Sequence, residues 1–182
     1  AHSAEPVRDT SDELKTALES LLNQFDVVVT TGGISVGKYD LVKQTLEELG
    51  VEQIFYKVKQ KPGKPVYAGK KVEKLVFALP GNPASALVCF YEYVLPSINK
   101  MSGRRDYKLS KKMVPLAHSF KMNNTRDIFF KAKVTDEKVT ILGGQGSDML
   151  QTFAEANALV LLPAGEKQYK PGDSVKTHLL PV

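Results

Sequence analysis

The chain has no tryptophan, one cysteine and three histidines among its 182 residues. A single cysteine, Cys89, excludes an internal disulfide, and its place in the apolar run 86–90 favours buried packing over a nucleophilic role. The three histidines show no metal-ligand spacing with one another or with Cys89, so a structural zinc site is not expected. No apolar run approaches the roughly 20 residues that cross a bilayer, and residues 1–6 lack the basic start and apolar core of a signal peptide. We therefore expect a cytoplasmic protein without a membrane span.

The basic charge is concentrated in one short stretch. Residues 57–74 hold seven lysines against one acid, Glu73, whereas the whole chain has a formal net charge of only +5. Charge confined to one window, with a single aromatic residue, Tyr67, among the lysines, argues against a nucleic-acid-binding module. Like charges packed this closely predict an oxyanion ligand, and the alternative is a solvated lysine strand that protects a sheet edge.

The first hundred residues alternate helix and strand patterns. A capping box at 10–13 opens the first helix, Asp40 can open the second, and Asn82–Pro83 suits the start of the third. We expect helices at about 11–25, 41–49 and 84–96, an extended lysine run from 57, a turn near Gly69, and buried strands at 26–31 and 74–79. This order predicts an α/β layer with a mostly parallel sheet. Glycine turns follow both buried strands, and open α/β sheets bind ligands at that edge.

The character of the sequence changes at about residue 104. Short runs rich in β-forming residues follow, separated by glycine, proline and asparagine, at 128–134, 139–142, 158–162 and 174–180. We therefore expect two domains, an α/β domain at 1–103 and a small all-β, barrel-like domain at 104–182.

Four motifs occur in order along the chain. They are Asp-Val-Val-Val-Thr-Thr-Gly-Gly-Ile-Ser-Val-Gly-Lys-Tyr-Asp at 26–40, Lys-Pro-Gly-Lys-Pro at 61–65, Leu-Pro-Gly-Asn-Pro-Ala-Ser at 79–85 and Gly-Gly-Gln-Gly-Ser at 143–147. Together they resemble the molybdopterin molybdenumtransferases, the family of bacterial MoeA proteins, plant enzymes of molybdenum cofactor synthesis and the gephyrin E domain. The first and third motifs alone would also fit molybdopterin adenylyltransferases and competence-damage-type domains. The fourth motif, in the β-rich tail, favours the molybdenumtransferases.

The resemblance implies a fold, a reaction and partners. It implies a three-layer molybdopterin-binding-type domain, and an enzyme that inserts molybdate into adenylylated molybdopterin with release of AMP. It also implies a homodimer, Mg2+ as cofactor and an encounter with the molybdopterin adenylyltransferase. The family's α/β domain begins with a further strand and an acidic loop that are not seen here, so we expect a C-terminal fragment with an incomplete sheet and active site. The alternatives are an adenylyltransferase-like enzyme and a gephyrin-E-like scaffold that binds receptor peptides.

The motifs also assign candidate site residues. Asp40, Lys57 and Lys61 match catalytic positions of the family, and Asp40 matches the carboxylate for the cation, although it also suits a helix N-cap. The candidate substrate-binding residues are Gly32, Gly33, Ser35, Gly37, Lys64, Pro80, Gly81, Asn82, Pro83, Ser85, Arg126 and Ser147. In a regular strand Lys57 and Lys61 would share a face roughly 13 Å apart, while Lys59 is assigned to the surface. Arg126 stands in Thr-Arg-Asp-Ile-Phe, which departs from the Gly-Arg-x-Glu-Phe segment of the family.

Overall fold

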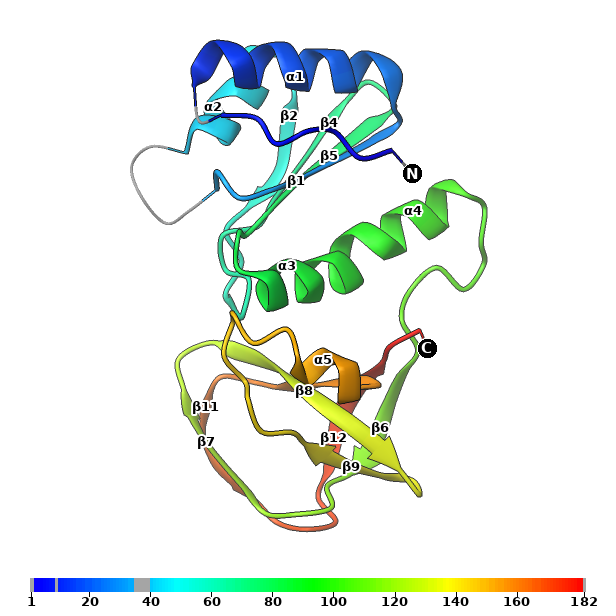
Figure 1. The fold of residues 1–182 in the computed structure, drawn as a ribbon. Coiled ribbons are helices and arrows are strands. Elements are labelled where there is room, and N and C mark those ends of the chain that lie inside the picture. The colour runs from blue at the N-terminus through cyan, green and yellow to red at the C-terminus, as the bar shows by residue number, and fades with distance from the viewer. Residues whose placement is uncertain (1, 9, 35–39, 182) are drawn as a thin grey trace. The chain divides into compact units, whose positions relative to one another are not determined.

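A computed structural model describes residues 2–8, 10–34 and 40–181 of the chain (Figure 1). The described residues fall into two compact units: those within 1–58 and 65–81 form the first, and those within 59–64 and 82–182 form the second. The chain therefore leaves the first unit at Val58, contributes a short turn to the second unit, and returns at Pro65. Each unit is described by itself below. No helix among the described residues is long and apolar enough to span a membrane.

The first unit is an α/β layer, as predicted. Its elements are α1 (Ser11–Gln24), β1 (Val27–Thr31), α2 (Leu41–Glu48), β2 (Glu52–Tyr56), β4 (Tyr67–Lys71) and β5 (Lys74–Leu79). The strands form one sheet in the order β1-β5-β4-β2, and only the β1–β5 pair is parallel. The sheet is thus mixed, and the expectation of mostly parallel strands was wrong. The reason is a tight hairpin between β4 and β5, too short for the crossover that parallel strands require.

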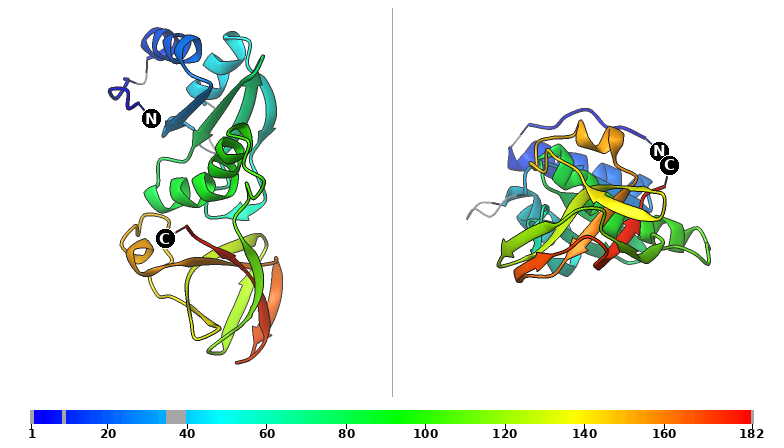
Figure 2. Two further views of the ribbon diagram at one scale, coloured as in Figure 1. Left: turned by 90° about the vertical axis from the view of Figure 1, so that its right-hand side faces the viewer. Right: turned by 90° about the horizontal axis from the view of Figure 1, so that it is seen from below.

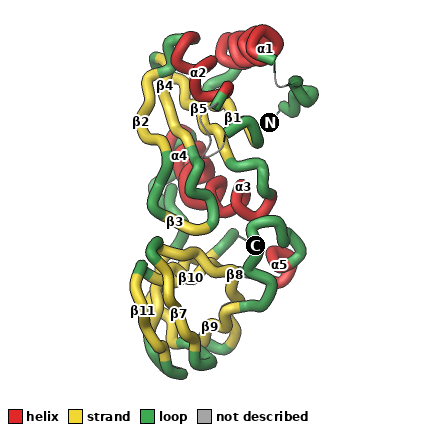
Figure 3. The backbone as a smooth tube through the Cα atoms, turned by 90° about the vertical axis from the view of Figure 1, so that its left-hand side faces the viewer, coloured by secondary structure: helices red, strands yellow, loops and turns green. Residues whose placement is uncertain are grey.

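The apolar stripe of α1 builds the core of this unit. Leu18 and Leu22 pack with residues of α2 and of the sheet, among them Leu46 and Val76. An ion pair of 3.0 Å between Lys15 and Glu48 joins the two helices, which lie side by side in Figure 3.

Two local expectations in this unit were wrong. Helix α1 begins after Thr10 as predicted, but the threonine makes no side-chain capping bond. Gly69 lies inside β4 rather than in a turn, and the glycine is explained by close packing, since a Cβ there would meet the Val51 side chain at 2.6 Å. The turn instead follows at Val72, whose φ is 56°.

The lysine run is not a regular strand. Lys57 has a φ of 60°, which ends the extended backbone of β2, and the next strand, β3 (Gln60–Lys61), has two residues. β3 pairs in parallel with β8 of the second unit, so the run passes from one sheet to another. The predicted alternation, and with it the shared face of Lys57 and Lys61, was therefore wrong. A left-handed residue changes the direction of the chain before any second lysine is reached.

The second unit is built mainly of strands. They are β3, β6 (Lys111–Pro115), β7 (Phe120–Asn124), β8 (Asp127–Thr135), β9 (Lys138–Ile141), β10 (Ala158–Leu162), β11 (Gly165–Tyr169) and β12 (Ser174–Leu179). A sheet runs β3-β8-β10-β12-β6 with β9 on β8, and β7 pairs separately with β11 (Figure 3). The four predicted strands are confirmed as β8, β9, β10 and β12. An isolated bridge between Leu116 and Val139 brings the sheet ends together, but the described strands form no closed barrel.

A continuous helical run enters the second unit. It consists of α3 (Pro83–Cys89), the π-helical η1 (Phe90–Val94) and α4 (Leu95–Met101), and a short helix, α5 (Thr152–Glu155), lies later in the chain (Figure 2). The run passes the end predicted at Pro96, because the wider π turn precedes the proline and the Ser97 hydroxyl donates to the Tyr93 carbonyl at 2.8 Å. Val88 packs in one cluster with Phe129 and Leu159, which ties the run to the strands. The domain boundary expected at residue 103 stays a prediction.

Candidate functional site

Two glycine turns meet at the carboxyl end of the parallel pair β1–β5. The Gly32 amide donates to the Leu79 carbonyl at 3.1 Å, and a Cβ on Gly81 would lie 3.5 Å from the Gly32 Cα. Gly32 and Gly33 have φ values of 83° and 65°, which only glycine adopts without strain. The first and third motifs are therefore adjacent in the first unit. Ser35 and Gly37, also predicted for this site, lie outside the described residues.

Asp40 is held by a tyrosine that the motifs did not indicate. Its side chain is buried at the N-cap position of α2, where it makes no capping bond. Its carboxylate accepts a hydrogen bond from the Tyr56 hydroxyl instead. The ring of Tyr56 also contacts two ammonium groups, with Lys57 Nζ 4.5 Å and Lys43 Nζ 5.7 Å from its centre. Tyr56 thus contacts both predicted residues, Asp40 and Lys57. Its position directly before Lys57 is the feature of the sequence that could have indicated it.

The described residues offer no protein-only cage for a cation. Among them no three histidine, cysteine, aspartate or glutamate side chains gather closely enough to hold a metal ion. Mg2+ is often held by one or two carboxylates together with substrate phosphates. Asp40 is a single carboxylate, so it would hold Mg2+ only together with a bound phosphate.

Lys61 and Lys64 flank a turn of the second unit at Pro62 and Gly63. Both side chains are exposed, as is that of Lys59, so exposure alone does not separate the two motif lysines from the one assigned to the surface. Arg126 lies beside this segment, because its guanidinium Nη1 donates to the Gln60 carbonyl at 3.5 Å. The three predicted cations Lys61, Lys64 and Arg126 therefore belong to neighbouring segments of the second unit.

Buried polar groups hold this turn from beneath. The Gln60 side chain is 5% exposed, donates to the Pro62 carbonyl at 2.9 Å and accepts a hydrogen bond from the Tyr93 hydroxyl. Cys89 is fully buried, and its thiol lies 3.6 Å from the Gly63 carbonyl. Burial, with a smaller effect of the Glu92 carboxylate, raises the pKa of the Cys89 thiol to about 12. The cysteine is therefore a protonated packing residue, as its sequence context predicted.

A third contact joins the motifs at 79–85 and 143–147. The Asn82 amide donates to the Ser147 hydroxyl at 2.9 Å, and the Ala84 amide donates to the Ser147 carbonyl at 3.1 Å. Asn82 is the N-cap residue of α3 but makes no side-chain cap bond, since its side chain is used for Ser147. Ser85 is 3% exposed, so its hydroxyl does not lie open to solvent. Pro83 has no amide hydrogen and the Ala84 amide is engaged, so neither residue offers a free backbone donor at this turn.

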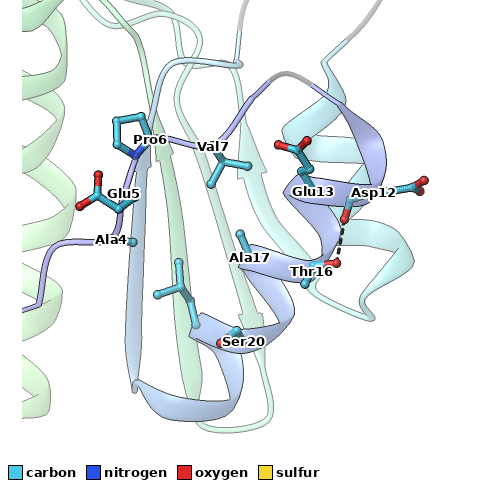
Figure 4. Close-up of a pocket in the computed structure, with 10 residues that line it drawn as sticks. Ala4, Glu5, Pro6, Val7, Asp12, Glu13, Thr16, Ala17 and Ser20 are labelled. Atoms are coloured by element: carbon cyan, nitrogen blue, oxygen red, sulfur yellow. Dashed lines mark hydrogen bonds between the residues drawn. The ribbon is translucent and has the colours of Figure 1, made fainter.

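A different hollow of the first unit has no part in these contacts. It is lined by residues 4–7 and one side of α1, where the Thr16 hydroxyl donates to the Asp12 carbonyl at 2.9 Å (Figure 4). None of its lining residues belongs to the four motifs.

Each unit carries its own set of candidate groups. The first unit has the glycine turns, the buried Asp40 carboxylate and Lys57, and the second unit has Lys61, Lys64, Arg126 and the Asn82–Ser147 pair. No described cysteine or histidine is placed as a nucleophile. Groups of this kind bind and orient an anionic ligand rather than form a covalent intermediate with it.

Comparison with known proteins identifies the family. A family model described as "Probable molybdopterin binding domain" matches residues 1–100, and one described as "MoeA C-terminal region (domain IV)" matches residues 113–180. The chain is 32% identical over 182 residues to a Haemophilus influenzae protein named molybdopterin molybdenumtransferase, covering 94% of this chain and 45% of the relative. It is 37% identical over 163 residues to the Drosophila melanogaster molybdenum cofactor synthesis protein cinnamon, covering 85% of this chain and 27% of the relative.

A solved structure agrees with these relatives. The molybdopterin biosynthesis MoeA protein from Pyrococcus horikosii superimposes with a TM-score of 0.77 at 31% identity, over 97% of this chain and 42% of that protein. The chain thus spans less than half the length of these relatives. The predicted resemblance is confirmed: the chain belongs to the molybdopterin-binding domain family of the MoeA type, with the MoeA C-terminal region following that domain.

Proposed function

We propose that this chain acts in molybdenum cofactor biosynthesis as a molybdopterin molybdenumtransferase, which inserts molybdate into adenylylated molybdopterin and releases AMP. The observation that carries the proposal is the hydrogen bond between Asn82 and Ser147. It joins the motif shared with adenylyltransferases to the motif of the β-rich tail, which favours the molybdenumtransferases. The match to the MoeA C-terminal region supports the same choice over an adenylyltransferase.

Each group of site residues has a role in this proposal. Lys61 and Lys64 bind the molybdate dianion, and Arg126 adds charge-assisted hydrogen bonds to an anionic ligand. The backbone at Gly32, Gly33, Pro80 and Gly81, with Ser35 and Gly37, lies against pterin and phosphate groups, where the absence of side chains permits close approach. Asn82, Pro83, Ser85 and Ser147 shape the neighbouring turn. The chain's task is orientation and charge neutralisation, because ligand exchange at molybdenum needs no covalent help from the protein.

Asp40 and Lys57 take the catalytic positions in the first unit. Asp40 would hold Mg2+ together with substrate phosphate, and the cation would neutralise the diphosphate as it is cleaved. The Tyr56 hydroxyl fixes the carboxylate, and Lys57 supplies a positive charge beside the same ring. A homodimer, transfer of substrate from the adenylyltransferase and a cytoplasmic location belong to the same proposal. Nucleic acid has no part in it.

Equilibrium dialysis of the chain against molybdate tests the proposed anion site. In the double variant Lys61→Met/Lys64→Met, we expect molybdate affinity to fall by at least tenfold, because two cations that face the ligand are removed. Lys59→Met is the matched control, since it removes an exposed lysine two residues from Lys61 and should change affinity less than twofold. Equal losses in control and double variant would show that molybdate is attracted by general positive charge and would refute the site assignment.

A further inference from the structure

Lys131 is a buried lysine on β8 that none of the motifs contains. Its side chain is 3% exposed, and its ammonium group donates to the Met149 carbonyl at 2.8 Å and to the Gly146 carbonyl at 3.3 Å. The ammonium also lies 5.7 Å from the centre of the Phe153 ring. Burial lowers the pKa of Lys131, and the Asp148 carboxylate opposes that effect. Burying an ammonium group is costly, so its contacts with two carbonyls of one loop call for an explanation.

A second side chain fixes the same loop to the same strand residue. The Gln145 side-chain carbonyl accepts from the Lys131 amide at 2.9 Å, and its amide group donates to the Lys131 and Leu142 carbonyls at 2.8 Å each. The glutamine side chain therefore imitates a strand that pairs with β8. Lys131 is at the centre of both interactions, through its backbone with Gln145 and through its ammonium with Gly146 and Met149.

The residue between these attachments is Ser147. Its hydroxyl accepts from Asn82 and its carbonyl accepts from Ala84, at the start of α3. The loop 143–149 is otherwise short of regular structure, since it lies between β9 and α5. The carbonyls that Lys131 binds thus belong to the residue before Ser147 and to the residue two positions after it. The Lys131 ammonium group binds the loop from β8, and Asn82 and Ala84 contact the same loop at Ser147.

We propose that Lys131 is a positioning residue for the substrate site: its ammonium group fixes the loop 143–149 so that Ser147 is held against Asn82 and Ala84. The contribution to substrate binding rests on the proposed function, because it requires the Asn82–Ser147 pair to line the site. The contribution to loop position does not rest on it. A lysine that only filled space in the core could be replaced by methionine, which has a similar length and no charge, without releasing Ser147.

Hydrogen exchange tests the position of the loop without any substrate. In Lys131→Met we expect the Ala84 amide, which donates to the Ser147 carbonyl, to exchange at least tenfold faster, while amides of the β8–β10 ladder such as Val160 keep their rates. Lys133→Met is the matched control, because Lys133 is an exposed lysine two residues along the same strand and should leave the Ala84 amide unchanged. Lys131→Arg keeps the charge and should restore part of the protection. An Ala84 amide that stays protected in Lys131→Met would overturn the proposal.

A second measurement tests the hydrogen bond on which the proposal depends, and it needs no Lys131→Met variant. Nuclear magnetic resonance of the unmodified chain should show a slowly exchanging Lys131 ammonium group with a coupling across its hydrogen bond to the Met149 carbonyl carbon. A rapidly exchanging ammonium group without that coupling would contradict the geometry and the proposal with it.

Kinetics then separate the two parts of the inference. In molybdate-dependent AMP release, Lys131→Met should raise the KM for adenylylated molybdopterin about tenfold with kcat within about twofold, since a displaced Ser147 weakens binding before reaction. A loop that loosens without a change in KM would limit Lys131 to loop position and refute its part in substrate binding. Failure of the unmodified chain to bind either molybdate or adenylylated molybdopterin would refute the proposed function, while hydrogen exchange would still decide whether Lys131 positions the loop.

Discussion

The turn that carries Lys61 and Lys64 depends on the close approach of Gly63 and Cys89, and this contact can be tested by substitution. A Cβ on Gly63 would lie well under 3.0 Å from the Cys89 sulfur and 3.1 Å from the Gln60 amide nitrogen. Gly63 also has a φ of 86°, in the left-handed region. Gly63→Ala therefore combines two effects, a backbone conformation that side chains disfavour and a collision with a buried thiol.

The two effects have separable magnitudes. The left-handed conformation costs an alanine about 1–2 kcal/mol, and overpacking a tight site costs about 1–3 kcal/mol more. Gly50→Ala isolates the first effect, since Gly50 has a φ of 76° and no atom within 4 Å of its would-be Cβ. Cys89→Ala removes the sulfur that the new methyl group meets, at a cost of about 1 kcal/mol for one buried heavy atom. The double variant Gly63→Ala/Cys89→Ala should therefore be more stable than the sum of the single effects by about 1–3 kcal/mol.

Urea unfolding followed by circular dichroism measures this coupling in the four members of the cycle. Gly63→Ala should be the least stable single variant, with a free energy of unfolding about 2–5 kcal/mol below that of the unmodified chain. Gly50→Ala should lose only about 1–2 kcal/mol. A coupling energy below about 0.5 kcal/mol would show that the thiol does not restrict the turn. The close approach would then have no part in holding the two lysines.

Two further predictions concern buried polar groups. Burial raises the pKa of the Cys89 thiol from 9.0 to about 12, so its contribution to stability is complete below pH 9 and is lost as pH rises toward 12. Unfolding measured at pH 8, 9 and 10 should show that the unmodified chain loses about 1.4 kcal/mol of stability by pH 10 and that Cys89→Ala does not. Identical pH profiles for the two chains would contradict the assignment. Tyr56→Phe removes the hydroxyl that donates to the buried Asp40 carboxylate, so the first unit should lose about 1.5–3 kcal/mol in urea unfolding. Tyr107→Phe is the control, because the Tyr107 ring lies near two lysine ammonium groups and its hydroxyl forms no hydrogen bond with a described residue. It should cost less than about 0.5 kcal/mol, and equal costs would refute a special role for Tyr56.

The sequence allowed the fold class to be predicted where patterning is strong. The apolar stripe of α1 and the short apolar runs of β1, β8 and β10 identify these elements without tertiary information. The strands β6, β7 and β11 were not predicted, because their sequences are polar and their burial is slight. The two-residue strand β3 could not be predicted, since it exists only through pairing with a strand more than sixty positions later.

The candidate site residues could be named from the sequence where they belong to motifs, and their assignment stays a prediction. The structure adds that two of them from separate motifs, Asn82 and Ser147, form a hydrogen bond. The supporting side chains Tyr56, Gln60 and Lys131 were missed, because each acts through a contact distant in sequence and none has a distinctive spacing. Local pattern identifies groups that could face a ligand, whereas the groups that hold them in place depend on packing that only the folded chain provides.

The folded chain also bears on the simpler interpretation of the lysine run as protection of a sheet edge. β3 does lie at the end of its sheet, but it has only two residues, and an edge this short presents few unpaired backbone groups to protect. Lys70 pairs with Glu52 at 3.5 Å and Lys74 donates to the Phe25 carbonyl at 3.1 Å, so these two later lysines of the run have structural partners.

Lys61 and Lys64, by contrast, form no ion pair with any described residue, while Gln60, Tyr93 and Cys89 fix the backbone between them. Solvated lysines need no such support, because their side chains adapt to solvent from any backbone position. A rigid turn with two unpaired cations is what recognition of an anion requires, since preorganisation reduces the entropy lost on binding.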